Sequence, residues 1–234
     1  MKSNIHYILC MVLGILCISC KKDNYQAPGS SFQGRLVYKG EPINVSYNDV
    51  YFELWEPGWG KNTPITVSIT QEGNFSALLF DASYKLVIPA SQGPFRSVPD
   101  KTTNTDTMLL HLTGSQTMDI EVMPYYMIRT PKFAAAGKTI TATCAVEKII
   151  TDINAKDIER VYLYIGKTQF VDGRTTLKSA SIAGADITNP AAVSLQVDVP
   201  DITPAQHYVF ARIGVKVAGV EDMIFSTVQQ IEGI

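Results

Sequence analysis

The chain has 234 residues, with 20 basic and 22 acidic side chains and a formal net charge of −2. This near-neutral balance, without any basic stretch, excludes a typical nucleic-acid-binding protein. Hydrophobic residues make up 46% of the chain, which is enough for one large or two small buried cores.

The N-terminus has the organisation of an export signal. A lysine near the start precedes an apolar run over residues 5–18, which is too short to span a bilayer as a helix. The run ends in Ile-Ser-Cys and polar residues follow at once. This resembles the bacterial lipoprotein signal, in which a cysteine becomes the lipidated mature N-terminus. The resemblance implies a signal peptide over 1–19, lipidation of Cys20 and stable membrane anchoring.

Residues 20–30 are polar and contain Pro, Gly and Ser, so they predict a tether between the lipid and the fold. Lys21 follows the cysteine, which resembles outer-membrane sorting and implies the cell surface or the periplasmic face of that membrane. An ordinary secreted protein with an incidental Cys20 is the alternative. Only Cys144 would remain unmodified in the mature chain, so no internal disulfide is expected.

Short strands begin at residue 31. Runs such as GRLVYKG, NDVYFELW and NFSALLF are rich in Val, Phe and Tyr and are separated by turn-forming residues, and the QEGN turn predicts a tight hairpin. We expect a first domain over 31–124. The segment 89–107 is expected to be a long loop without regular structure, which is typical of functional or mobile segments.

The strand pattern restarts after PYYMIRTP and predicts a second domain over 125–234. Cys144 is in phase with apolar neighbours in TITATCAVE, so we expect a buried, inert thiol. The last two strands flank AGVED and should form a hairpin. Residues 152–160 suggest a helix of about two turns at most. The sequence therefore predicts an all-β protein with two tandem β-sandwiches.

Two resemblances refine this fold. GRLVYKGEPI, ITQEGNFSALL and YKLVIP are similar to the prealbumin-like, carboxypeptidase-regulatory-type sandwich, and the second half resembles immunoglobulin or fibronectin-III modules. The order of these motifs resembles a Bacteroidota lipoprotein family of unknown function that tends to accompany Sus-type glycan-uptake systems. The resemblance implies a binding role, with a glycan or an outer-membrane transporter complex as partner, and supplies no catalytic residues.

No catalytic or cofactor motif is present. The sequence lacks a phosphate-binding loop and a nucleophile elbow, and neither His111 nor His207 has partners at metal-ligand spacing. Asp119 and Glu121 share a strand face and could act as acid and base, but a solvated strand face explains them equally well. We therefore predict no enzyme, no cofactor and no metal, and keep a site assembled only in space as the least favoured alternative.

Aromatic residues are the strongest binding candidates. In DVYFELW, alternation places Val50, Phe52 and Leu54 toward the core and the intervening residues on the other face. An aromatic–acid–aromatic row suits sugar binding, and a Pro-Gly turn keeps the second tryptophan near the first. VYLYIG repeats the pattern in the second domain. The candidate ligand- or partner-binding residues are Tyr51, Glu53, Trp55, Trp59, Tyr162 and Tyr164.

Packing of these rows against a loop, the other domain or a protein partner is the alternative. Asp-Thr-Met at 106–108 resembles an O-glycosylation motif of exported Bacteroidota proteins and makes Thr107 a candidate acceptor. The predicted function is an accessory binding lipoprotein of an outer-membrane glycan-uptake system. A structural or adhesive, fimbrillin-like lipoprotein is the alternative; such proteins are cleaved after a basic residue, but Arg35 fits a strand residue better.

Overall fold

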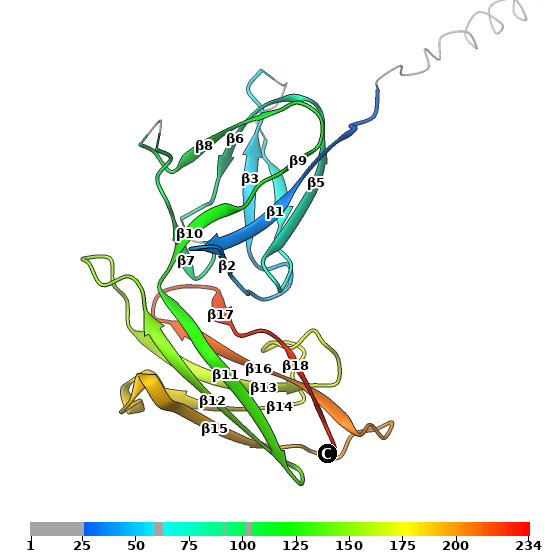
Figure 1. The fold of residues 1–234 in the computed structure, drawn as a ribbon, viewed down its shortest axis with the longest axis vertical. Helices are drawn as coiled ribbons and strands as arrows, with labels where there is room; N and C mark the ends of the chain where they lie inside the picture. Colours follow the sequence, from blue (N-terminus) through cyan, green and yellow to red (C-terminus); the bar gives the residue numbers. More distant parts are fainter. Residues whose placement is uncertain (1–25, 59–62, 91, 102–103) are drawn as a thin grey trace, which may run out of the picture.

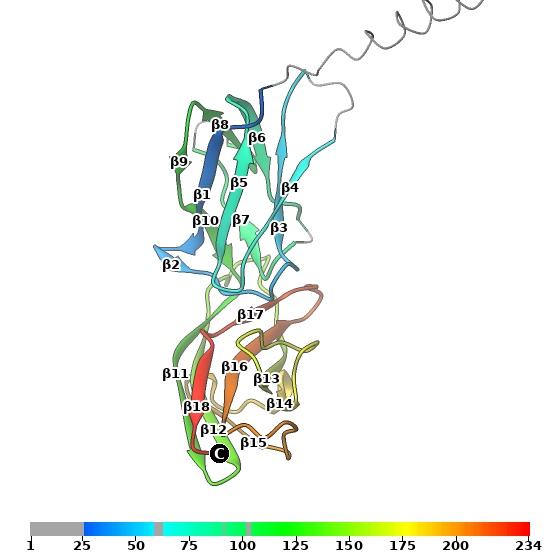
Figure 2. The same cartoon turned by 90° about the vertical axis from the view of Figure 1, so that its right-hand side faces the viewer.

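The computed structural model describes residues 26–58, 63–90, 92–101 and 104–234. These residues form two domains arranged end to end, each built from two β-sheets (Figures 1 and 2). The predicted all-β, two-domain fold is confirmed. Within this part of the chain, no helix has the length and apolar character needed to cross a membrane.

The N-terminal domain packs a six-stranded sheet against a four-stranded sheet. In the first sheet, β1 pairs in parallel with β10 and antiparallel with β5. Its strands are β1 (Ser30–Tyr38), β2 (Glu41–Pro42), β5 (Asn74–Leu79), β7 (Phe95–Ser97), β9 (Gln116–Thr117) and β10 (Ile120–Pro124). The second sheet has the order β4-β3-β6-β8. Its strands are β3 (Tyr51–Trp55), β4 (Ile65–Ser68), β6 (Ala82–Val87) and β8 (Thr107–Leu112).

Three phenylalanines join these sheets. The rings of Phe52 and Phe75 lie 5.0 Å apart between centroids, and Phe32 lies 5.1 Å from Phe75. Gly34 lets β1 pass close to the following strands, because a Cβ there would lie 1.8 Å from the carbonyl oxygen of Met118. Only glycine fits this position of GRLVYKG without moving the backbone.

The C-terminal domain packs a three-stranded sheet, β11-β12-β15, against a five-stranded one. The first contains β11 (Tyr126–Ala136), β12 (Thr139–Lys148) and β15 (Val193–Asp198). The second contains β13 (Ile158–Gly166), β14 (Lys178–Ala183), β16 (Tyr208–Val217), β17 (Met223–Phe225) and β18 (Gln229–Glu232). One sheet thus holds the first, second and fifth strands of the domain, and the other sheet holds the remaining strands. This is an immunoglobulin-like arrangement. The expected hairpin around AGVED is formed by β16 and β17.

Cys144 lies in β12 with 5% of its surface exposed, as expected. Burial raises the pKa of its thiol to about 11. The thiolate is therefore scarce at neutral pH, which agrees with an inert core residue.

Two local expectations were wrong. Residues 152–160 form no helix, because the Asp152 side chain accepts a hydrogen bond from Asn154 N at 2.8 Å and holds a turn before β13 begins at Ile158. The segment 89–107 contains a strand, β7, which pairs with β10. Phe95 is 2% exposed and anchors that strand in the core.

The two domains meet without a linker. Tyr125 alone separates β10 from β11, and it is buried. Phe225 N, in β17, donates to Asn44 O at 2.9 Å, and Gly93 N donates to Asp222 Oδ2 at 3.0 Å. β17 accordingly lies at the junction in both views (Figures 1 and 2). These hydrogen bonds therefore join the domains in addition to the continuous chain at Tyr125.

Candidate functional site

The outer face of the β4-β3-β6-β8 sheet carries the predicted aromatic row. Phe52 and Leu54 point inward and are almost fully buried, whereas Tyr51, Glu53 and Trp55 alternate with them and are half-buried. The structure therefore places these three candidates together on one face, outside the sandwich core.

A hydrogen bond fixes the geometry of this row. The indole Nε1 of Trp55 donates to Glu53 Oε2 at 2.9 Å. Bonds to ionised acceptors are stronger than neutral ones, so the contact holds the indole in one orientation beside the carboxylate. A carboxylate has about four acceptor positions, so Glu53 can still accept hydrogen bonds from hydroxyl groups.

The neighbouring strands complete the surface. Lys85 on β6 lies directly opposite Trp55, and Leu109 on β8 lies opposite Lys85. Directly opposite side chains have Cβ atoms about 4.5–5.5 Å apart. Leu109 is 62% exposed. The face therefore combines an aromatic ring, an aliphatic surface, a carboxylate and an ammonium group.

Thr107, the candidate glycosylation residue, lies on this same face at the start of β8. It pairs with Val87, which in turn pairs with Glu53, so two strand spacings of about 4.8 Å each separate Thr107 from Glu53. The Thr107 side chain is half-buried. Strand pairing thus places a modification candidate beside the aromatic row.

Two candidates, Trp59 and Cys20, lie outside the described residues. The turn that precedes Trp59 is described as far as Gly58, which has a φ of +94°. A positive φ fits the second central position of the type II turn expected for Pro57-Gly58.

The second aromatic row is covered. The rings of Tyr162 and Tyr164 stack with centroids 5.1 Å apart, but Tyr164 is 5% exposed and belongs to a buried cluster with Val171 and Phe225. Burial raises the pKa of the Tyr164 hydroxyl, which lies 3.8 Å from Met223 Sδ. The packing alternative therefore applies to Tyr164, and only Tyr162 is partly accessible.

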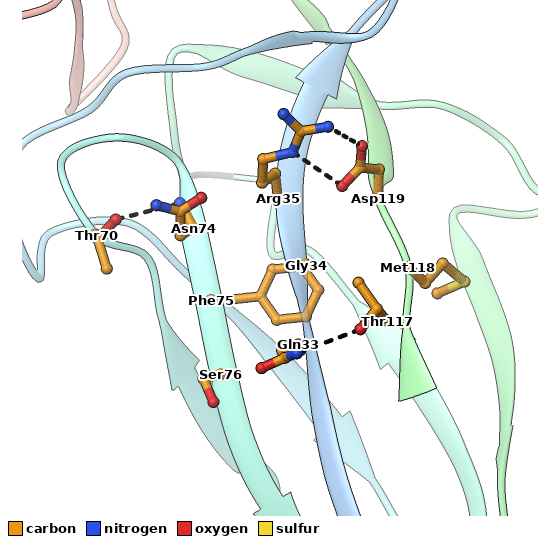
Figure 3. Close-up of a pocket in the computed structure, with 10 residues that line it drawn as sticks. All are labelled: Gln33, Gly34, Arg35, Thr70, Asn74, Phe75, Ser76, Thr117, Met118 and Asp119. Carbon is orange, nitrogen blue, oxygen red and sulfur yellow. Dashed lines mark hydrogen bonds and ion pairs between the residues drawn. The ribbon is translucent and has the colours of Figure 1, made fainter. Parts of the chain in front are cut away.

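A polar groove of about 720 Å³ lies on the other sheet of the N-terminal domain (Figure 3). Arg35 and Asp119 lie at one end and form a two-fold contact, with Nη2 2.6 Å from Oδ2 and Nε 3.2 Å from Oδ1. Further along, Gln33 Nε2 donates to Thr117 Oγ1 at 3.3 Å. Arg35 lies within β1, as expected for a strand residue.

The carboxylates considered as an acid–base pair each have another partner. The hydrogen bond from Arg35 holds the pKa of Asp119 below its usual value. Glu121 accepts a hydrogen bond from Lys39 N at 2.6 Å. A general acid needs a raised pKa, so Asp119 is unsuited to that role. Among the residues with described positions, no three His, Cys, Asp or Glu side chains are placed to hold a metal ion.

Comparison with known proteins identifies the family of this chain. A model of the "Protein of unknown function (DUF3823) N-terminal domain" matches residues 30–123, and a model of "Domain of unknown function (DUF3823_C)" matches residues 126–230. A DUF3823 family protein from Parabacteroides merdae is 32% identical, with a TM-score of 0.76 over 88% of this chain and 100% of that one. The chain belongs to the DUF3823 family.

Further solved structures share the fold. One from Bacteroides ovatus is 25% identical, with a TM-score of 0.73 over 87% of this chain and 98% of that one. A Bacteroides uniformis structure described as a "putative carbohydrate binding protein" is 20% identical and shares the fold, with a TM-score of 0.67 over 88% of this chain and 99% of that one. No curated protein matches the sequence.

Sequence reasoning missed the residues at the domain junction of this DUF3823 protein. Alternation assigns Arg212 to the outer face of β16, yet its side chain is only 1% exposed. Tyr47 and Phe170 come from different domains and their rings lie 5.1 Å apart. The available signal was an arginine in the middle of a largely apolar strand, which alternation places on the same face as Lys216 and Tyr208.

Proposed function

We propose that this DUF3823 protein is a lipid-anchored, non-catalytic binding protein that contacts glycans through the outer face of the β4-β3-β6-β8 sheet. The observation that carries the proposal is the 2.9 Å hydrogen bond that orients the Trp55 indole beside the Glu53 carboxylate. Lys85, directly opposite Trp55, adds a donor next to the ring.

The chemistry of this face matches a sugar. A sugar ring has apolar C–H surfaces that stack on an aromatic ring, and hydroxyl groups that donate and accept hydrogen bonds. Glu53 accepts such bonds and Lys85 donates them, so the two charged groups can form hydrogen bonds with the hydroxyls at the edge of the stacked sugar ring. The Bacteroides uniformis structure described as a "putative carbohydrate binding protein" has the same fold, which supports this class of ligand.

The proposed anchor places the face near a membrane. Lipidation of Cys20 would leave about ten residues before β1 begins at Ser30. An extended chain spans at most about 3.6 Å per residue, so the N-terminal domain would stay within roughly 35 Å of the bilayer. We place the protein on the outer membrane, as an accessory of a glycan-uptake complex.

Affinity electrophoresis with a panel of neutral polysaccharides tests the binding proposal. We expect at least one polysaccharide to retard the wild-type protein, and Trp55→Ala to abolish the retardation. Leu78→Ala is the matched control, because Leu78 is an exposed apolar residue on the other sheet of the same domain. An unretarded wild-type protein, or equal retardation of Trp55→Ala, would contradict the proposal.

Detergent phase partition tests the anchor separately. The full-length protein expressed in a bacterial host should enter the detergent phase, and Cys20→Ser should move to the aqueous phase. Equal partition of both proteins would show that Cys20 carries no lipid.

A further inference from the structure

A cavity of about 360 Å³ lies at the junction of the two domains. The N-terminal domain contributes Asn44, Gln71 and Glu72 to its lining, and the C-terminal domain contributes Gln169, Arg212 and Gln230. Its volume falls within the range of about 300–1,000 Å³ that is usual for small-molecule sites.

Arg212 is the buried charge of this cavity. Its side chain is 1% exposed, and its Nε and Nη2 donate to the carbonyl oxygens of Ser226 and Gln71, each at 2.9 Å. The guanidinium also stacks on Phe225, with Cζ 4.3 Å from the ring centroid. None of these three partners carries a charge. Over the described residues, no carboxylate forms an ion pair with Arg212.

A buried cation without a directly bonded anion is costly for a folded protein. The carboxylates of Glu72 and Asp172 favour the charged form of Arg212 through space, but neither forms an ion pair with it among the described residues. Burial lowers the pKa of Arg212 to about 10, so the group is still charged at neutral pH. A guanidinium has five N–H donors, and the two carbonyl oxygens use two of them. The other three have no acceptor within the described part of the chain. A carboxylate placed in the cavity would supply a charged acceptor in direct contact with these donors.

The rest of the lining fits a polyhydroxylated ring. Asn44, Gln169 and Gln230 contribute carboxamides to the lining, and carboxamides both donate and accept hydrogen bonds. The Nε2 of Gln230 already donates to Glu232 Oε1, which leaves its Oε1 to accept a bond from a ligand hydroxyl. Phe210 adds an aromatic surface. This mixture suits hydroxyl groups and the C–H surface of a sugar better than it suits a purely apolar ligand.

We infer that the interdomain cavity binds a carboxylate-bearing sugar, of the uronic acid class, with its carboxylate on Arg212 and its hydroxyls on the carboxamides. Glu72 is an exposed residue of the same lining, so its negative charge opposes the ligand carboxylate and weakens its binding. This inference does not depend on the proposal for the Trp55 face, and either proposal can be wrong while the other is correct.

Calorimetry with digalacturonate and its dimethyl ester tests the inference, because the two probes differ only in the charge and bulk of the carboxyl groups. The wild-type protein should bind the acid at least about tenfold more tightly than the ester, as expected for hydrogen bonds to a charged group. Equal affinities, or no binding of either probe, would overturn the inference.

Charge-neutralising variants test whether the acid binds in this cavity. Glu72→Gln should raise the affinity for the acid about threefold by removing a nearby like charge, and should leave the ester unchanged. Glu159→Gln is the matched control, because this exposed carboxylate lies near the start of β13, whereas Phe210 pairs with Gly166 at its other end. An identical effect of both variants, or none from Glu72→Gln, would overturn the assignment.

Arg212→Gln should remove the preference for the acid. If thermal denaturation shows that this variant does not fold, Gln230→Glu gives an independent result, because Gln230 is exposed and lines the same cavity. This added carboxylate should weaken acid binding about threefold. Trp55→Ala should leave digalacturonate binding intact; loss of binding there would assign the acid to the outer face and overturn the cavity site.

Discussion

The strands YFELW and VYLYIG have the same alternation of aromatic and aliphatic residues but different surroundings. In β3, the row that contains Trp55 lies on the outer face of the N-terminal sheet and is half-buried. In β13, Tyr164 is 5% exposed and packs on Val171 and Phe225. The same pattern thus gives one open row and one covered row.

The difference comes from the segments that lie over each strand. The connection from β13 to β14 folds back over Tyr164. Its Gly173 lies so close that a Cβ there would be 3.6 Å from the Tyr164 hydroxyl. Tyr164 also lies directly opposite Arg212, whose Nη2 bonds to Gln71 of the other domain. Strand phase therefore tells which face a side chain occupies, and the connections decide whether that face is open.

The largest expected effect is on the covered row. Tyr164→Ala removes a buried ring and leaves a cavity, so the free energy of unfolding should fall by about 3–5 kcal/mol. Denaturant titration followed by circular dichroism measures this loss. A loss below about 1 kcal/mol would mean that the ring is exposed in solution.

Alkaline pH should reveal the same burial. The pKa of Tyr164 is raised by desolvation in the folded state. Burial of the neutral side chain therefore contributes fully to the free energy of unfolding below the unfolded pKa of about 10. That contribution is lost as the pH rises from there toward the higher folded pKa, because the unfolded chain ionises first. Stability of Tyr164→Phe should decline less than that of the wild type in this range. Parallel declines in denaturation curves measured between pH 9 and pH 11 would contradict the assignment.

Trp55→Ala should have a smaller effect on stability than Tyr164→Ala. The indole is half-buried and lies outside the sandwich core, so we expect a loss of about 1 kcal/mol. The same denaturant titration provides the comparison. Equal losses for the two variants would show that Trp55 is a packing residue, which would remove the contrast between the rows.

The smallest effect concerns Glu53→Gln. The amide oxygen can still accept the hydrogen bond of the Trp55 indole, and because both side chains are half-buried, water offsets most of the difference between a charged and a neutral acceptor. Stability should change by only a few tenths of a kcal/mol, whereas glycan affinity should fall about fivefold. Calorimetry with a polysaccharide that retards the wild type measures this. Unchanged affinity would separate Glu53 from the binding face.

Much of the fold was predictable because it depends on local patterns. Alternation located the buried Cys144 and the outward position of Trp55, and turn residues located the β16–β17 hairpin. The turn at Asp152 was mistaken for a helix, since a side chain that bonds its own backbone competes with helix formation.

The domain junction was not predictable because it depends on distant pairs. Arg212 and Gln71 are 141 residues apart in the sequence, and their contact buries a charge that strand phase places only on the outer face of β16. Tyr47 and Phe170 likewise come from different domains, and their rings lie 5.1 Å apart only because the domains pack together. A single strand pattern contains no information about which segment of another domain will cover it.

Fluorescence of Trp55 tests glycan contact at the open row most directly. The chain has two tryptophans, so Trp59→Phe leaves Trp55 as the only indole. Titration of this variant with oligosaccharides from the neutral panel should produce a saturable change in emission, which Lys85→Ala should weaken. If oligosaccharides bind by calorimetry while the Trp55 emission stays constant, or if none binds, the outer face of the β4-β3-β6-β8 sheet is not a glycan site.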